Sequence, residues 1–143
     1  MAHGVFVVGI DGSATSLRAA AYAVGLARRQ DSRVVAVYVR PSASGMLSIA
    51  DPFGVTVAAA MAAQNDVERE FREAIQRERA LIDVDLELLV RYGDPFTELS
   101  RAAVELRADA VVVGRSVGAL HRLTGSVAVR LVRSGRWPVI VVP

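Results

Sequence analysis

The sequence of 143 residues contains no cysteine and no lysine, and each absence excludes a group of chemistries. Without cysteine the chain forms no disulfide, offers no thiolate nucleophile and holds no thiolate-bound zinc or iron–sulfur cluster. Without lysine it has neither the phosphate-binding lysine of a P-loop nor a lysine for Schiff-base chemistry. Only His3 and His121 are present as histidines, so we expect no metal site made by the protein alone.

Long hydrophobic runs are also missing. No apolar stretch reaches the ~18 residues that a membrane-spanning helix needs, so we expect no membrane partner. The first residues lack the basic segment of a signal peptide, which predicts a cytoplasmic location. Hydrophobic residues make up 52% of the chain, as in folded proteins, and the length predicts a single domain over residues 1–143.

The 17 basic residues are all arginine, and their distribution is uneven. Eight acidic residues and four arginines lie between Asp66 and Glu87, whereas five arginines and no acidic residue follow Asp109. A basic C-terminal quarter favours an anionic ligand such as phosphate. Aromatic residues do not alternate with these arginines, so we expect no nucleic-acid partner. The use of arginine alone, with many alanines and valines, indicates a GC-rich coding sequence and hence a bacterial source.

Five short apolar runs alternate with helical patterns along the chain. The runs predict strands at Val5–Ile10, Val34–Val39, Val84–Val90, Ala110–Val113 and Val139–Val142. Four are near-continuous, as in strands buried on both faces of a parallel sheet, and the third alternates as an edge strand does. Helices are predicted at Ser16–Arg29, at Asp66–Arg79, after Gly93-Asp94-Pro95 and at Ser126–Ser134. The alanine-rich residues before Asp66 are compatible with an extension of the second helix toward the N-terminus. This order predicts an α/β fold with one parallel sheet and helices on both faces.

Two further expectations concern the second helix and the segment before it. Glu68 and Arg72 have the spacing of an i,i+4 ion pair on the outer surface. The segment from Pro41 to Thr56 mixes apolar with turn residues and fits neither pattern. It predicts a lid or a contact surface, or else a disordered loop.

In sheets of this kind, ligands bind beyond the carboxyl ends of the strands, where the winding reverses. Asp11 at the first strand end is either a helix cap or turn anchor, or a ligand to a ribose hydroxyl or a metal-bound phosphate. Tyr38, near the second strand end, either stacks near an adenine or fills the other face of its strand. The glycines after the fourth strand and the helix N-terminus at Ser126 form either a phosphate cradle or an ordinary capped turn.

Several short motifs occur together in one order along the chain. They are Asp11-Gly12-Ser13, Gly93-Asp94-Pro95, Ala108-Asp109-Ala110-Val111-Val112-Val113-Gly114, Gly125-Ser126-Val127 and Trp137-Pro138-Val139-Ile140-Val141-Val142. With these motifs the chain resembles the universal stress protein family from Phe6 to Pro143.

The resemblance implies a Rossmann-like five-stranded sheet of order 3-2-1-4-5, and a homodimer paired through the fifth strand. The implied dimer contacts are Val139, Ile140, Val141 and Val142. For one branch of the family it also implies bound ATP, with Asp11 near the ribose and phosphates and the backbone of Val39 at the adenine. Mg²⁺ would reach Asp11 only through the nucleotide. The implied nucleotide-binding residues are Asp11, Gly12, Ser13, Val39, Gly114, Arg115, Gly118, Gly125, Ser126 and Val127.

The loop after the fourth strand departs from the family's Gly-x2-Gly-x9-Gly-Ser/Thr pattern. Its spacing is Gly114-x3-Gly118-x6-Gly125, two residues shorter, and Val117 stands where a glycine amide would meet phosphate. Arg115 and Arg122 would add charge-assisted contacts to phosphate. The sequence therefore predicts a stress-response module that binds ATP or AMP, with a nucleotide-free dimerisation or signalling module as the alternative.

A third interpretation is a serine hydrolase, because residues 114–118 fit the Gly-x-Ser-x-Gly motif with Ser116 as nucleophile. His121 is the only histidine after Ser116, and no acidic residue follows Asp109, so the triad order cannot be formed. We interpret the match as coincidence. Asp11 is the only obvious base for a water molecule, and we expect no enzyme, although slow ATP hydrolysis stays open.

Overall fold

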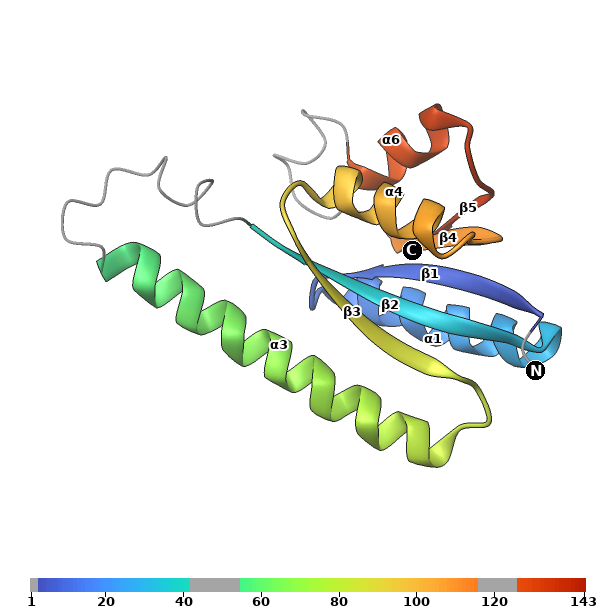
Figure 1. The fold of residues 1–143 in the computed structure, drawn as a ribbon, viewed down its shortest axis with the longest axis horizontal. Helices are drawn as coiled ribbons and strands as arrows, with labels where there is room; N and C mark the ends of the chain where they lie inside the picture. The colour runs from blue at the N-terminus through green and yellow to red at the C-terminus, as the bar shows by residue number, and fades with distance from the viewer. Residues whose placement is uncertain (1–2, 42–54, 116–125) are drawn as a thin grey trace.

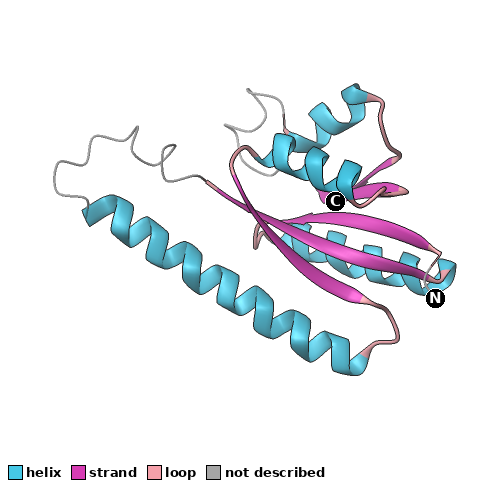
Figure 2. Ribbon diagram, viewed as in Figure 1, coloured by secondary structure: helices cyan, strands magenta, loops and turns pink. Residues whose placement is uncertain are grey.

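The computed structural model describes residues 3–41, 55–115 and 126–143, and strands alternate with helices through these ranges (Figure 2). The strands are β1 (Gly4–Ile10), β2 (Ser32–Arg40), β3 (Leu86–Tyr92), β4 (Ala110–Gly114) and β5 (Val139–Val142). The helices are α1 (Ala14–Gln30), α3 (Val55–Leu81), α4 (Pro95–Glu105) and α6 (Val127–Ser134). The segment from Pro41 to Thr56 falls mostly outside the described residues.

The five strands form one parallel sheet in the order β3-β2-β1-β4-β5. β1 lies at the centre, where Val7 is in register with Val35 of β2 and with Val111 of β4. The chain winds from β1 outward to β3 and then returns to β4 and β5. This winding places α1 and α3 on one face of the sheet and α4 and α6 on the other (Figure 1). The predicted fold class and strand order are confirmed, and β3 is an edge strand as its alternation predicts.

Each central strand supplies two hydrophobic cores, because successive side chains point to opposite faces of the sheet. Phe6 and Val8 of β1 pack on the face covered by α1 and α3. Val7 packs on the opposite face with Leu99 of α4 and Leu131 of α6. Burial on both faces explains why the sequences of β1, β2 and β4 are almost continuously apolar.

The two helices on the first face pack differently. α1 turns Ala19, Ala23 and Ala27 to the sheet, and none of these side chains is exposed to solvent. These residues follow one another at i,i+4 spacing, so they form a stripe of small side chains along which the helix backbone lies close to the strands. α3 instead packs through larger side chains, including Phe71 and Ile75.

Several element boundaries differ from the sequence predictions by one or two residues, and the start of α3 differs by more. α3 begins at Val55, because the alanine-rich residues before Asp66 continue the helix without glycine or proline, as their composition allowed. β3 begins at Leu86 rather than Val84, because Val84 packs against the core from the preceding loop without joining the ladder. α1 begins at Ala14, two residues before the predicted start.

The helices on the second face start as predicted. The Asp94 carboxylate caps α4 by accepting a hydrogen bond from the backbone N–H of Thr97 at 2.9 Å, and Pro95 follows it in the first turn. Ser126 caps α6, which ends at Gly135 with a φ of 62° in the left-handed region.

Candidate functional site

The last residues of the parallel strands lie at one end of the sheet, which we call its carboxyl end (Figure 1). Ile10 closes β1 and Gly114 closes β4, and these two strands are neighbours. The chain leaves β1 toward α1 on one face and leaves β4 toward α6 on the other. This divergence is the switch point at which open α/β sheets bind ligands, and Asp11 and Arg115 directly follow the two strands.

Asp11 anchors the turn between β1 and α1. Its Oδ1 atom accepts a hydrogen bond from the backbone N–H of Ser13 at 2.9 Å, across Gly12, whose φ of 86° favours glycine. Ser13, and not Asp11, caps α1, because the Ser13 Oγ accepts from the backbone N–H of Ser16 at 3.2 Å. The prediction of a helix cap at Asp11 is therefore wrong, and the prediction of a turn anchor is confirmed.

The Asp11 side chain is exposed and keeps its negative charge. Partial burial raises the pKa of Asp11, but hydrogen bonds from Ser13 and Ser16 outweigh this effect and hold the pKa below its usual value of 3.8. An exposed carboxylate beside two strand ends is suited to accept hydroxyl hydrogen bonds or to bind a cation.

Gly114 brings the end of β4 into direct contact with the first turn of α1. A Cβ atom on Gly114 would lie 2.5 Å from the carbonyl carbon of Thr15 and 2.6 Å from the backbone nitrogen of Ser16. The Thr15 hydroxyl donates to the carbonyl oxygen of Arg115 at 2.9 Å, and the Arg115 N–H donates to the carbonyl of Val142 at 2.8 Å. The Arg115 backbone is thus held from two sides, while its side chain is exposed.

The N-terminus of α6 lies on the other side of the switch point and is tied to α4. The Ser126 Oγ accepts from the backbone N–H of Val129 at 3.2 Å. Arg130 lies 3.5 Å from the Asp94 carboxylate and 4.2 Å from the centre of the Phe96 ring. The capped start of α6, with Val127 in its first turn, is therefore fixed relative to the start of α4.

Part of the predicted site falls outside the described residues. This part comprises Ser116, Val117, Gly118, His121, Arg122 and Gly125. The described residues that the structure brings to the switch point are Asp11, Gly12, Ser13, Gly114 and Arg115.

The end of β2 holds a buried cation that the sequence analysis did not select. Val39 is half-buried, and Arg40 is only 5% exposed. The predicted i,i+4 ion pair of Glu68 and Arg72 is confirmed at 3.3 Å, but Glu68 is half-buried rather than on the outer surface and also lies 3.4 Å from Arg40. Glu68 and Phe71 are one helical turn apart, which places both side chains on one face of α3. In the sequence, this spacing was the one indication that Glu68 lies on the same side of the helix as a core residue.

Tyr38 belongs to the core of the first face. Its ring meets the Phe71 ring edge-on, with 5.0 Å between the ring centres, and the residue is 7% exposed. Burial raises the pKa of the Tyr38 hydroxyl, an effect that exceeds the lowering by nearby Arg40. Of the two interpretations of Tyr38, the packing one is confirmed.

Within residues 3–41, 55–115 and 126–143, no group of three histidine, aspartate or glutamate residues could hold a metal ion. No helix that the structure describes is long and apolar enough to cross a membrane. A polar hollow of about 460 Å³ lies at the opposite end of the sheet, between the last turns of α1 and α3, and no predicted site residue lines it.

The sheet order, the two-sided helices and the switch point define a doubly wound α/β protein. Residues 4–143 match the model of the family described as Universal stress protein family, and the chain belongs to that family. A universal stress protein of Methanocaldococcus jannaschii is 28% identical over 142 residues, covering 95% of this chain and 79% of the relative.

Solved structures of the family have the same fold. The universal stress protein UspA from Lactobacillus plantarum superposes with a TM-score of 0.79 at 22% identity, covering 100% of this chain and 99% of that chain. A universal stress protein solved in complex with cAMP superposes with a TM-score of 0.74 at 28% identity, with 100% and 99% of the two chains covered.

Proposed function

We propose that this chain binds an adenine nucleotide, ATP or AMP, at the carboxyl end of its sheet. The observation that carries the proposal is the contact between Gly114 and the first turn of α1, which joins the Asp11 turn and Arg115 into one surface at the switch point. A related protein at 28% identity is described as a complex with cAMP, which supports an adenine nucleotide as the ligand class.

The charges at this surface fit a nucleotide with bound Mg²⁺. Asp11 supplies a carboxylate that stays ionised, suited to a ribose hydroxyl or to a cation carried by the phosphates. Arg115 supplies an exposed guanidinium for the phosphates, and the capped N-terminus of α6 adds backbone N–H groups. Val39 offers its backbone to the adenine. Gly118 and Gly125 would complete the phosphate loop.

The first experiment identifies what the purified protein carries. Freshly purified protein is denatured, and the released small molecules are separated by ion-pair chromatography and identified by mass spectrometry. Protein that releases nothing is then titrated with Mg-ATP, AMP and cAMP by calorimetry. Release or saturable binding of one of them supports the proposal. No release and no binding would assign the chain to nucleotide-free dimerisation or signalling.

The same proposal includes a homodimer paired through β5. β5 hydrogen-bonds to β4 on one side and stands last in the sheet order, so its other side offers backbone groups to a second copy. Val141 is 41% exposed, whereas Val139, Ile140 and Val142 are half-buried and pack against the two cores. A pairing of two β5 strands would cover Val141 and the remaining exposed parts of Val139, Ile140 and Val142.

We propose a binding module rather than an enzyme. Among the described residues at the switch point, Asp11 is the one group able to act as a base, and its lowered pKa makes it a weak one. The cytoplasmic location, the bacterial source and a role in a stress response are predictions made on the sequence and on the family.

A further inference from the structure

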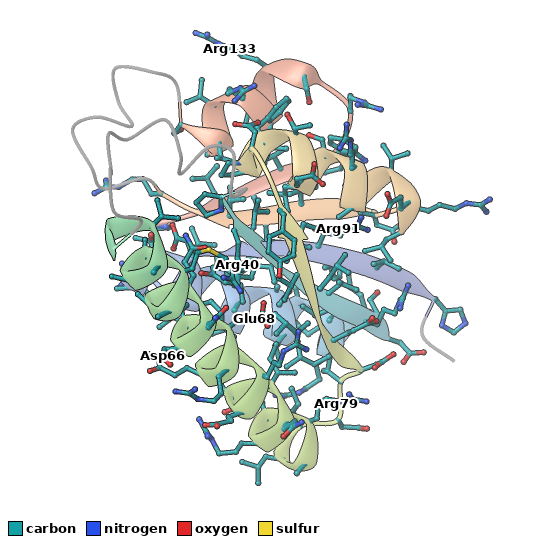
Figure 3. All side chains as sticks on the ribbon, turned by 60° about the vertical axis from the view of Figure 1, so that its left-hand side comes forward. Arg40, Asp66, Glu68, Arg79, Arg91 and Arg133 are labelled. Atoms are coloured by element: carbon teal, nitrogen blue, oxygen red, sulfur yellow. The ribbon has the colours of Figure 1, made fainter. Side chains whose placement is uncertain are left out.

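Arg40 is a buried cation whose side chain contacts α3 and the end of β3. Its Nε donates to Gln64 Oε1 at 3.2 Å, its Nη1 to Glu68 Oε1 at 3.4 Å and its Nη2 to the Met61 carbonyl at 3.5 Å. The guanidinium also lies 5.4 Å from the centre of the Tyr92 ring. Figure 3 shows Arg40 and Glu68 next to each other between the sheet and α3. Each of the three guanidinium nitrogens thus has a partner in α3, so the side chain is directed at this helix.

These contacts hold the N-terminal half of α3, which is largely exposed. Residues 58–63 of α3 are exposed, and Gln64 is half-buried. The first buried side chain described in the helix is Phe71. In Figure 1 the N-terminal turns of α3 extend beyond the strand ends. Arg40 therefore ties this half of the helix to the carboxyl end of the sheet.

α3 contacts the turn at the switch point through the side chain of Phe71. A Cβ atom on Gly12 would lie 3.7 Å from the Phe71 Cζ, so the ring edge stands against the Asp11-Gly12-Ser13 turn. The same ring meets Tyr38 of β2 edge-on. Glu68, which Arg40 holds, and Phe71 are one helical turn apart. A shift of α3 would therefore remove the support behind the turn that carries Asp11.

Burying an ion pair seldom adds net stability compared with an apolar pair of similar size. Its hydrogen bonds are directional, and we infer that here they select one position of α3. We propose that Arg40 is a positioning residue of the nucleotide site: by holding Glu68 it sets α3 so that Phe71 supports the Asp11 turn. This inference rests on the proposed function. It adds α3, which no site prediction included, to the elements on which nucleotide affinity depends.

The test separates positioning from stability by replacing both charges. In Arg40→Met/Glu68→Met the buried pair becomes apolar, so the denaturant midpoint stays at or above that of the wild type. The geometry is no longer fixed, and we expect Mg-ATP to bind roughly tenfold more weakly in calorimetry at unchanged stoichiometry. The matched control is Arg33→Met/Glu87→Met, which removes a pair 3.5 Å apart between the neighbouring strands β2 and β3, near the opposite end of the sheet and away from α3. This control variant should bind Mg-ATP with the affinity of the wild type.

Each outcome of this test either supports or overturns the positioning role of Arg40. Equal affinity in Arg40→Met/Glu68→Met and wild type overturns the inference and leaves the proposed function intact. A wild type that binds no adenine nucleotide overturns both. A variant that does not fold is replaced by Phe71→Leu, which keeps an apolar side chain in the core but withdraws the ring from Gly12. Phe71→Leu must then bind more weakly than wild type at full stoichiometry, and wild-type affinity would overturn the inference.

Discussion

Gly114 and Thr15 are packed so closely that no side chain fits between them, because a Cβ atom on Gly114 would lie 2.5 Å from the Thr15 carbonyl carbon. Gly114 ends the strand on one side of the switch point, and Thr15 lies in the first turn of the helix that leaves the other side. The Thr15 hydroxyl bonds to the next carbonyl, that of Arg115. The candidate site is thus built on a contact between two backbones.

Gly114→Ala should destabilise the protein through this contact. The added methyl group must displace the backbone of Thr15 and Ser16, and overpacking of this kind costs about 1–3 kcal/mol of unfolding free energy. Urea denaturation measures the loss. The control is Gly25→Ala within α1, where a Cβ would meet only Arg29 Nη1 at 3.6 Å. That variant should gain about 0.5–1 kcal/mol, because alanine is the better helix former. Equal stability of Gly114→Ala and wild type would contradict the prediction.

Asp11→Asn should separate the charge of Asp11 from its role in the turn. Asparagine keeps an oxygen that accepts from the Ser13 N–H and loses only the contribution of the charge, so the urea midpoint of this variant should lie between those of Asp11→Ala and wild type. The lost charge should weaken Mg-ATP binding roughly tenfold in calorimetry. Asp11→Ala serves as the comparison, since it removes both charge and acceptor and should lower stability as well. Unchanged Mg-ATP affinity in Asp11→Asn would exclude a carboxylate role at the nucleotide.

The Asp94 charge should contribute to stability in a defined pH range. Burial raises the pKa of Asp94, but hydrogen bonds from Thr97 and the charge of Arg130 outweigh this and lower it below 3.8. A folded-state pKa below the unfolded one gives stability that is present above the unfolded pKa and is lost as pH falls through the folded pKa. The urea midpoint of wild type should therefore exceed that of Asp94→Asn at neutral pH, and the difference should shrink below about pH 4. A difference in urea midpoint that grows as the pH falls would contradict the assigned direction of the Asp94 pKa shift.

Val141→Arg should shift a β5-paired dimer toward monomer. Val141 is 41% exposed and would be covered by a second copy, so a charge there opposes pairing with little effect on the fold. Ile140→Arg is a poorer test, because Ile140 packs against the core. Analytical ultracentrifugation of wild type and Val141→Arg over a range of concentrations measures the change. A wild type that sediments as a monomer, or a variant that stays dimeric, refutes the pairing.

The sequence was sufficient to predict the sheet because its signals are local. Valine-rich runs between amphipathic helices set the number and direction of the strands, and Asp94-Pro95 and Gly135 mark helix ends by their own conformational preferences. The strand order came from the family resemblance. Ser13 and Asp11 were harder to assign, because both residue types cap helices and only the hydrogen bonds show which one does so.

The Arg40 cluster could not be predicted for a different reason. An arginine at a strand end is ordinarily solvated, and burial of Arg40 depends on Gln64 and Glu68, which lie 24 and 28 residues further along the chain. Spacing along one helix predicted Glu68–Arg72 but gave no information on what the helix would face. Contacts between distant elements that involve polar side chains leave no periodic signal in the sequence.

Through the alanine stripe, α1 packs closely against the sheet from one end to the other. With 17 residues it is about 25 Å long, from the Ser13 cap at the carboxyl end to Asp31 at the other. Because Ala19, Ala23 and Ala27 are fully buried against the strands, a larger side chain at Ala27 should push the C-terminal end of α1 away from the sheet. We expect such a substitution to change the orientation of the Asp11 turn at the other end of the helix, far from the substituted residue.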